Sequence, residues 1–129
     1  MKRVVVDTSA LASVVFNEEG GPEVARLLEG AAVYAPALLR YELQQVAAKK
    51  CRRRPAQSRD VLAALDRVLD LHAAIVWIDP SPLDVVLMAN ATGLSAYDAS
   101  YLCLAGLLGA ELVTRDRQLA AALDPFVRS

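Results

Sequence analysis

Four acidic residues stand where acids are unusual, and their positions predict one shared chemical site. Asp7 follows the apolar run RVVV, and Asp116 follows ELVT. Glu42 and Asp98 fall instead on the apolar faces of helical patterns. An isolated charge on such a face is strongly unfavourable, so each of these acids needs a partner or a function. Most of the other acids lie in turns or beside helical stripes, where solvated charges are ordinary.

A cation is the partner that would bring four carboxylates together. Two like charges about 4 Å apart repel by roughly 4 kcal/mol at an effective dielectric constant of about 20. Oxygen ligands favour Mg²⁺ or Mn²⁺. The only histidine, His72, lies on an apolar helix stripe, and Cys51 and Cys103 lack metal-ligand spacing, which argues against zinc. A single histidine also gives little support to a Ser/His/Asp or Cys/His nucleophile system.

A magnesium site made of carboxylates suits the hydrolysis of phosphodiester bonds. The metal orients water and neutralises charge on the phosphate, while a carboxylate accepts the proton of the water. The basic run KKCRRR (49–54), with Arg115 and Arg117, would hold a nucleic-acid backbone. Aromatic residues make up only 5% of the chain, so we expect backbone contacts with little base stacking.

Each of the four acids also has a purely structural alternative. Asp7 and Asp116 could cap the helices that follow them. Asp98 could be a half-exposed acid favoured by the dipole of its helix. Glu42 could lie at the edge of its apolar stripe, paired with Arg40 or a nearby lysine.

Two further features have competing interpretations. Asp79 also ends a strand, but Pro80 and Pro82 indicate a rigid turn and a cap, so Asp79 is a second choice for the site. The run KKCRRR could simply complement the dipole at the end of its helix.

The elements that must position these acids alternate between strands and helices, which is typical of a parallel α/β sheet. The predicted strands are 3–7, 31–36, 74–78 and 111–114, with PFVRS (125–129) as an optional fifth. The predicted helices are 9–16, 22–30, 37–54, one after Pro55 whose apolar stripe ends at His72, 81–93 (capped by Ser81 and ended by Gly93), 95–110 and 116–123. Ligands bind at the carboxyl ends of parallel strands, where the strand order reverses. Strands would deliver Asp7 and Asp116 to that edge, and helices would carry Glu42 and Asp98 towards it.

Composition indicates one domain over residues 1–129, with a core of Ala, Leu and Val. The net charge of 14 − 15 = −1 gives no overall attraction to nucleic acid or to an anionic membrane. The amino-terminal apolar run is too short for a signal peptide, and no run is long enough to span a membrane. Two cysteines in helical segments suit a reducing compartment, so we expect a soluble, cytoplasmic protein.

The four acids and their surroundings resemble the PIN-domain nucleases, and most closely the VapC-type toxins of toxin–antitoxin pairs. The stretch VVVDTSAL resembles the first strand and first acid of the family, which assigns Asp7. APALLRYELQQVAAK assigns Glu42, and LSAYDASYLCLAGLLGAELVTRD assigns Asp98 and Asp116. Any one of these motifs is weak, but all four acids in this order and spacing are specific.

The resemblance implies a three-layer α/β/α sandwich with four or five parallel strands, and an endoribonuclease dependent on Mg²⁺ or Mn²⁺. It also implies an antitoxin that blocks the site, and a homodimer, for which helices 9–16 and 37–54 are candidate surfaces. Asp7 and Asp98 would hold the metal, and Glu42 and Asp116 would complete the shell, tune the water or bind a second ion. Hydroxyl support would come from Thr114, and from Thr8 or Ser9.

Other classes fit less well. A haloacid-dehalogenase-like phosphatase needs a second Asp at the position of Ser9, and a response-regulator receiver needs a Lys where this chain has Arg115. A PIN-like module that binds RNA or a partner without cutting stays open as the alternative. The RNA target is open as well.

Overall fold

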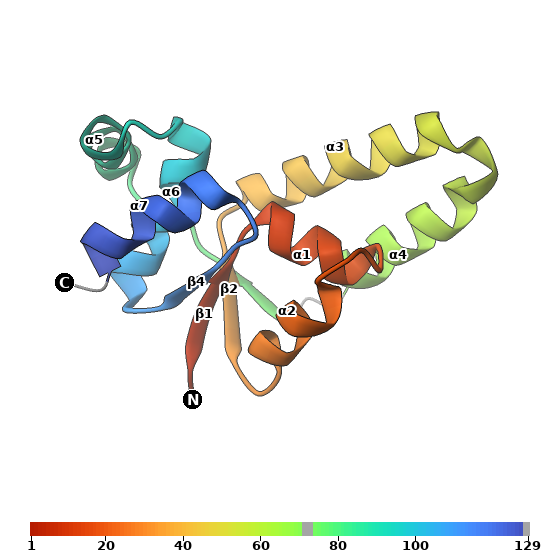
Figure 1. Ribbon diagram of the computed structural model, residues 1–129, viewed down its shortest axis with the longest axis horizontal. Coiled ribbons are helices and arrows are strands. Elements are labelled where there is room, and N and C mark those ends of the chain that lie inside the picture. Colours follow the sequence, from red (N-terminus) through yellow and green to blue (C-terminus); the bar gives the residue numbers. More distant parts are fainter. Residues whose placement is uncertain (71–73, 128–129) are drawn as a thin grey trace.

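The computed structural model describes residues 1–70 and 74–127 and contains a fully parallel four-stranded sheet with helices on both faces (Figure 1). The strands are β1 (Arg3–Val6), β2 (Ala32–Ala35), β3 (Ile75–Trp77) and β4 (Glu111–Val113). Their order in the sheet is β3-β2-β1-β4. This arrangement confirms the predicted α/β/α sandwich, with four strands among the described residues.

The central strand β1 explains why its sequence is continuously apolar. Val4, Val5 and Val6 are all fully buried, because β1 pairs on both sides and is covered on both faces. From β1 the chain adds β2 and then β3 outward, and later returns to place β4 on the other side of β1. The strand order therefore reverses between β1 and β4, so the carboxyl ends of these two strands form the expected ligand edge.

Seven α-helices form the outer layers of the described fold. They are α1 (Thr8–Val15), α2 (Gly21–Leu28), α3 (Leu38–Arg53), α4 (Ser58–Asp70), α5 (Pro82–Thr92), α6 (Ala96–Leu108) and α7 (Arg117–Val127), with a 3₁₀ turn at Pro55–Gln57. Helices α1 to α4 lie on one side of the sheet and α5 to α7 on the other (Figure 1). Helices α3 and α4 form a long hairpin that projects from the body. Helix α6 packs on β1 and is buried throughout its middle.

The optional fifth strand at 125–129 is wrong over residues 125–127, where α7 continues to Val127. Phe126 and Val127 favour strands locally, and Pro125 suggested the end of the helix. The packing of α7 against α6 outweighs these local preferences. Residues 128 and 129 lie outside the described residues, as does His72.

Helix ends largely follow the sequence signals. Gly93 ends α5 with φ +75°, a left-handed conformation that favours glycine. Ser81 stands at the amino-terminal cap position of α5, but its side chain makes no capping hydrogen bond. None of the helices over 1–70 and 74–127 combines the length and the apolar character needed to cross a membrane.

Candidate functional site

Asp7 lies at the carboxyl end of the central strand, and only 4% of it is exposed. Its Oδ1 accepts hydrogen bonds from the backbone N of Ala10 at 2.9 Å and from Oγ of Ser9 at 2.8 Å. Its Oδ2 accepts a hydrogen bond from the hydroxyl of Thr114. Asp7 therefore caps α1, as the structural alternative predicted, and also ties the end of β1 to the residue after β4.

Asp116 also combines capping with a place at this edge. Its Oδ1 accepts from the backbone N of Gln118 at 2.9 Å and of Leu119 at 3.2 Å, at the start of α7. Its own backbone N donates to Oγ1 of Thr114 at 3.0 Å. Thr114 thus connects the two strand-end acids through one hydroxyl.

Glu42 reaches the site from α3 and is held by two hydroxyls. Its Oε1 accepts from Oγ1 of Thr8 at 2.8 Å and from the hydroxyl of Tyr101 at 2.5 Å. Arg40 lies instead over the ring of Trp77, with Cζ 4.4 Å from the ring centroid. The expected alternative of an ion pair between Glu42 and Arg40 is therefore wrong.

Asp98 lies half-buried in the first turn of α6, where the helix dipole favours a negative charge. Its backbone N donates to Oγ of Ser95 at 3.1 Å, which caps the helix. Its carboxylate accepts no hydrogen bond from the described part of the chain. No buried side-chain oxygen there lacks a partner, so the carboxylate oxygens of Asp98 are accessible to solvent. The same reasoning leaves Oε2 of Glu42 and Oδ2 of Asp116 accessible.

The four carboxylates act on one another electrostatically. Burial raises the pKa of Asp7, outweighing the hydrogen bonds from Thr114, Ala10 and Ser9. Burial also raises the pKa of Asp98, and the negative charges of Asp116, Glu42 and Asp7 raise it further. The fold therefore brings the four predicted acids to one edge of the sheet, where the negative charges of the other three disfavour ionisation of Asp98.

Among the described residues, none of the four acids forms an ion pair. The ion pairs between described residues are Lys2–Glu111 and Lys50–Glu18, and neither involves the site. Among those residues, no three His, Cys, Asp or Glu side chains are close enough to hold a metal ion by themselves. Mg²⁺ commonly uses one or two carboxylates, with water and substrate phosphate completing its shell. The accessible, uncompensated oxygens of this cluster fit such an ion.

Two residues outside the four acids have roles defined by their hydrogen bonds. Asp79 accepts a hydrogen bond from the backbone N of Ala37 at 2.8 Å, just before α3, which matches the turn-and-cap interpretation. Tyr101 was not among the predicted site residues, yet its hydroxyl contacts both Glu42 and Thr8. A tyrosine hydroxyl on a buried helix face needs a polar partner, and that requirement was the available signal.

The predicted basic run lies on the projecting hairpin rather than beside the acids. At 1.5 Å per helical residue, Lys49 to Arg53 stand about 10 to 16 Å beyond Glu42 along α3. Lys50 pairs with Glu18 at 2.7 Å, and it lines a hollow of about 350 Å³ with Arg53, Arg54 and Gln57. The guanidinium of Arg115 contacts the backbone carbonyl of Glu19.

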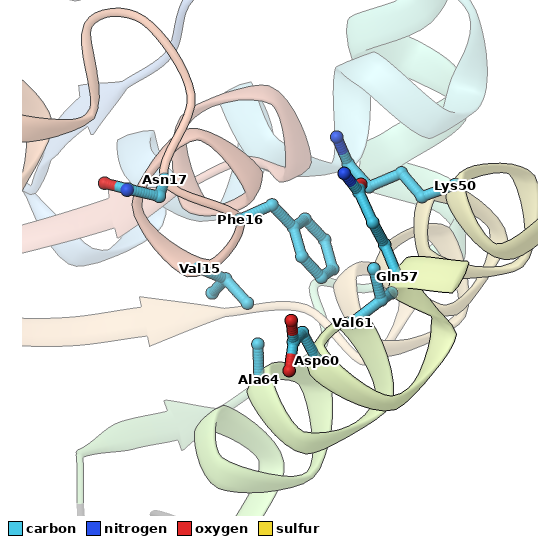
Figure 2. A pocket seen from close by; sticks show the side chains of 8 residues that line it. All are labelled: Val15, Phe16, Asn17, Lys50, Gln57, Asp60, Val61 and Ala64. Carbon is cyan, nitrogen blue, oxygen red and sulfur yellow. The ribbon is translucent and has the colours of Figure 1, made fainter. Parts of the chain in front are cut away.

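Several surface hollows surround the fold, and one of them, of about 470 Å³, is lined by the site acid Asp98 together with Gln118. Another, of about 550 Å³, is lined by Thr8 and Ser9, which follow Asp7 in the chain, and by Arg115. Another hollow of about 470 Å³ lies between the end of α1 and the α3–α4 hairpin (Figure 2). Its lining residues are Val15, Phe16, Asn17, Lys50, Gln57, Asp60, Val61 and Ala64. None of the four site acids lines the hollow in Figure 2, so it is separate from the acidic edge.

The chain is similar over nearly its whole length to a curated ribonuclease. The chain is 29% identical over 128 residues to ribonuclease VapC3 of Pyrobaculum aerophilum, and the alignment covers 97% of this chain and 98% of that protein.

Three solved structures share the fold. PAE2754 of Pyrobaculum aerophilum gives a TM-score of 0.76 at 24% identity, covering 98% of this chain and 93% of its own. VapC20 of Mycobacterium tuberculosis, described as a sarcin-ricin loop cleaving toxin, gives a TM-score of 0.65 at 17% sequence identity. The match covers 92% of this chain and 94% of VapC20. VapBC2 of Rickettsia felis, bound to a DNA fragment from its promoter, gives a TM-score of 0.64 at 15% sequence identity. The match covers 93% of this chain and 92% of the solved chain. At these identities the likeness establishes the fold.

The family model of the PIN domain matches residues 4–123. This range contains all four acids and, apart from Arg3 at the start of β1, every strand described above. The chain therefore belongs to the PIN-domain family, as its sequence motifs indicated.

Proposed function

We propose that this protein is a metal-dependent endoribonuclease and the toxin of a type II toxin–antitoxin pair. The observation that carries the proposal is the cluster of Asp7, Glu42, Asp98 and Asp116 at one sheet edge, where none of the four forms an ion pair with another described residue. The similarity to ribonuclease VapC3 supports RNA as the substrate. The whole chain, 1–129, would act as one catalytic domain.

We assign Asp7 and Asp98 as metal ligands for Mg²⁺ or Mn²⁺, as the resemblance to PIN-domain nucleases implies. Asp7 is fixed in place by three donors, and the carboxylate of Asp98 accepts no hydrogen bond from the described residues. Glu42 and Asp116 each have one oxygen occupied by donors and one oxygen accessible. These accessible oxygens can complete the shell or accept the proton of the attacking water.

When bound, the metal supplies a polarised water and neutralises charge that develops on the phosphate. The chain supplies the positions of the carboxylates. Ser9 and Thr114 hold both oxygens of Asp7, and Thr114 also orders the backbone of Asp116. Rigid placement of this kind lowers the cost of reorganisation during the reaction.

The surface around the acids suits an extended RNA strand. The hollows beside Ser9 and Asp98 leave room for nucleotides next to the cleaved phosphodiester. The basic residues on the α3 hairpin lie farther away and would contact the backbone beyond it. Salt would therefore weaken RNA binding without changing the chemistry at the carboxylates.

Cleavage of a cellular RNA pool tests the function directly. We expect cutting with Mg²⁺ or Mn²⁺, loss of cutting with a chelator, and recovery when metal is added in excess, since each carboxylate needs the cation to work. The ends of the products would begin to name the target. Failure to cut with either metal, combined with no metal binding by calorimetry, would instead support a catalytically silent PIN module.

We also propose an antitoxin partner, which the likeness to the VapBC2 structure supports. Its expected effect is to form a complex with this chain and to suppress RNA cutting. Co-expression of the two chains, followed by cleavage assays on the purified complex, would test this. Full activity of a stable complex would contradict a blocked site.

A homodimer is proposed as well, and α5 offers the surface. Leu83, Val86 and Leu87 are 76%, 52% and 66% exposed, and their spacing places them on one stripe. Of the surfaces suggested by sequence, α1 is unsuitable because its residues 10–13 are buried.

Light scattering is expected to give about twice the mass of one chain, because two such stripes would bury each other. Leu87→Asp should then give a monomer. Leu62→Asp makes the same change at an exposed leucine on α4 and should leave the dimer intact. A monomeric native chain at micromolar concentration would contradict the proposal.

A further inference from the structure

A buried hydroxyl lies directly behind the acidic edge. Tyr101 is 1% exposed, and its hydroxyl donates to Oε1 of Glu42 at 2.5 Å. The same hydroxyl lies 2.9 Å from Oγ1 of Thr8, which itself donates to Oε1 of Glu42 at 2.8 Å. Three oxygens from α1, α3 and α6 therefore form a compact triangle.

The number of protons in this triangle fixes its hydrogen bonds. Each hydroxyl carries one proton, and an ionised carboxylate carries none. Both protons point to Oε1 of Glu42, so none remains for a bond between Thr8 and Tyr101. Oε1 is fully engaged by two donors, whereas Oε2 has no partner among the described residues and faces solvent.

The phenol can act as a donor in this position. A phenol has an ordinary pKa of about 10 and carries its proton at neutral pH. Its hydroxyl is buried and lies 2.5 Å from Oε1 of Glu42, so this proton is shared with that oxygen.

We propose that Tyr101 is a positioning residue: together with Thr8 it holds Oε1 of Glu42, so that only Oε2 is presented to the metal centre. This inference rests on the proposed function. Glu42 would then contact a metal ion through Oε2 alone, because Oε1 is engaged by two hydroxyls. Groups that orient a metal-site carboxylate commonly change metal affinity or activity by about 10- to 100-fold when removed.

Tyr101→Phe tests the role because it removes one hydroxyl and keeps the ring. We expect kcat for RNA cleavage to fall about tenfold with KM within about twofold of native, and Mn²⁺ affinity by calorimetry to fall about tenfold. Tyr41→Phe makes the same change at a tyrosine that is 65% exposed on α3, and it should leave all three quantities unchanged.

A double-mutant cycle separates positioning from mere packing. In a Glu42→Gln background the carboxylate is absent, so Tyr101→Phe should change neither kcat nor Mn²⁺ affinity by more than about twofold. An equal loss in both backgrounds, or native behaviour of Tyr101→Phe alone, would overturn the proposal. If Tyr101→Phe fails to fold, Thr8→Val removes the other donor to Oε1 of Glu42. The same double-mutant cycle is then measured with Thr8→Val in place of Tyr101→Phe.

The Mn²⁺ measurements keep this inference distinct from the proposed function. A native chain that binds Mn²⁺ but cuts no RNA would refute the ribonuclease activity. The cycle on Mn²⁺ affinity would still confirm or overturn the role of Tyr101 in that case.

Discussion

Asp98→Asn is expected to lower the rate of RNA cleavage by at least about a thousandfold, because a lost metal ligand removes several kcal/mol of transition-state stabilisation. The substitution keeps the shape of the side chain and removes its charge. Since the carboxylate of Asp98 accepts no hydrogen bond from the described residues, the variant loses no internal partner. The measurement is single-turnover cleavage with saturating Mg²⁺.

The same variant should be at least as stable as the native protein when both are free of metal. Burial and three neighbouring negative charges disfavour the ionised form of Asp98, and the neutral amide removes that repulsion. The small loss of favourable interaction with the α6 dipole acts in the opposite direction. Asp84→Asn is the matched control, because Asp84 is an exposed first-turn acid on α5 outside the site. A clear drop in melting temperature for Asp98→Asn would show that the residue is mainly structural.

Added Mg²⁺ or Mn²⁺ is expected to raise the melting temperature by about 10 °C once the free metal reaches about a hundred times its dissociation constant. Binding to the folded state alone then contributes about 2.7 kcal/mol, and for a chain of this size each kcal/mol is worth roughly 3 to 5 °C. The physical reason is the relief of repulsion among the four carboxylates. An unchanged melting temperature at millimolar metal, measured near neutral pH, would count against an assembled site.

The metal-induced rise in melting temperature should depend on pH, because the pKa values of Asp7 and Asp98 are raised. Both groups ionise less readily in the folded protein than in the unfolded chain, whose Asp value lies near 3.8. Their contribution to metal-free stability is therefore fully present at low pH and is lost as the pH rises through the folded-state values. Lowering the pH from neutrality should stabilise the metal-free protein at these sites and shrink the metal-induced shift. The Asp98→Asn variant should show a weaker pH dependence of both quantities.

The arrangement of the site was largely predictable, because it depends on one rule of parallel sheets. A strand followed by an acid occurs at Asp7 and at Asp116, and both strand ends lie at the point where the strand order reverses. Glu42 and Asp98 were recognisable because a carboxylate on an apolar helix face conflicts with its surroundings. These signals are local in sequence, so no structure was needed to read them.

The partners of the acids were not predictable in the same way. Glu42 is held by residues 34 and 59 positions away, and no pattern along the chain specifies such pairs. The basic run was read correctly as a helix end, but only the geometry of α3 shows its distance from the acids. The end of α7 was misread because local propensity at Pro125 and Phe126 conflicts with packing against α6.

The sheet order has a consequence for how the protein is made. The last strand synthesised, β4, pairs with the first, β1, and only after it does the chain supply Thr114 and Asp116. A ribosome-bound chain that has paired β1, β2 and β3 holds Asp7 and Glu42 but neither Asp116 nor the Thr114 hydroxyl that donates to Oδ2 of Asp7. The proposed hydrolytic centre is therefore incomplete throughout translation of the first three strands, and it is complete only after β4 and Asp116 have been added.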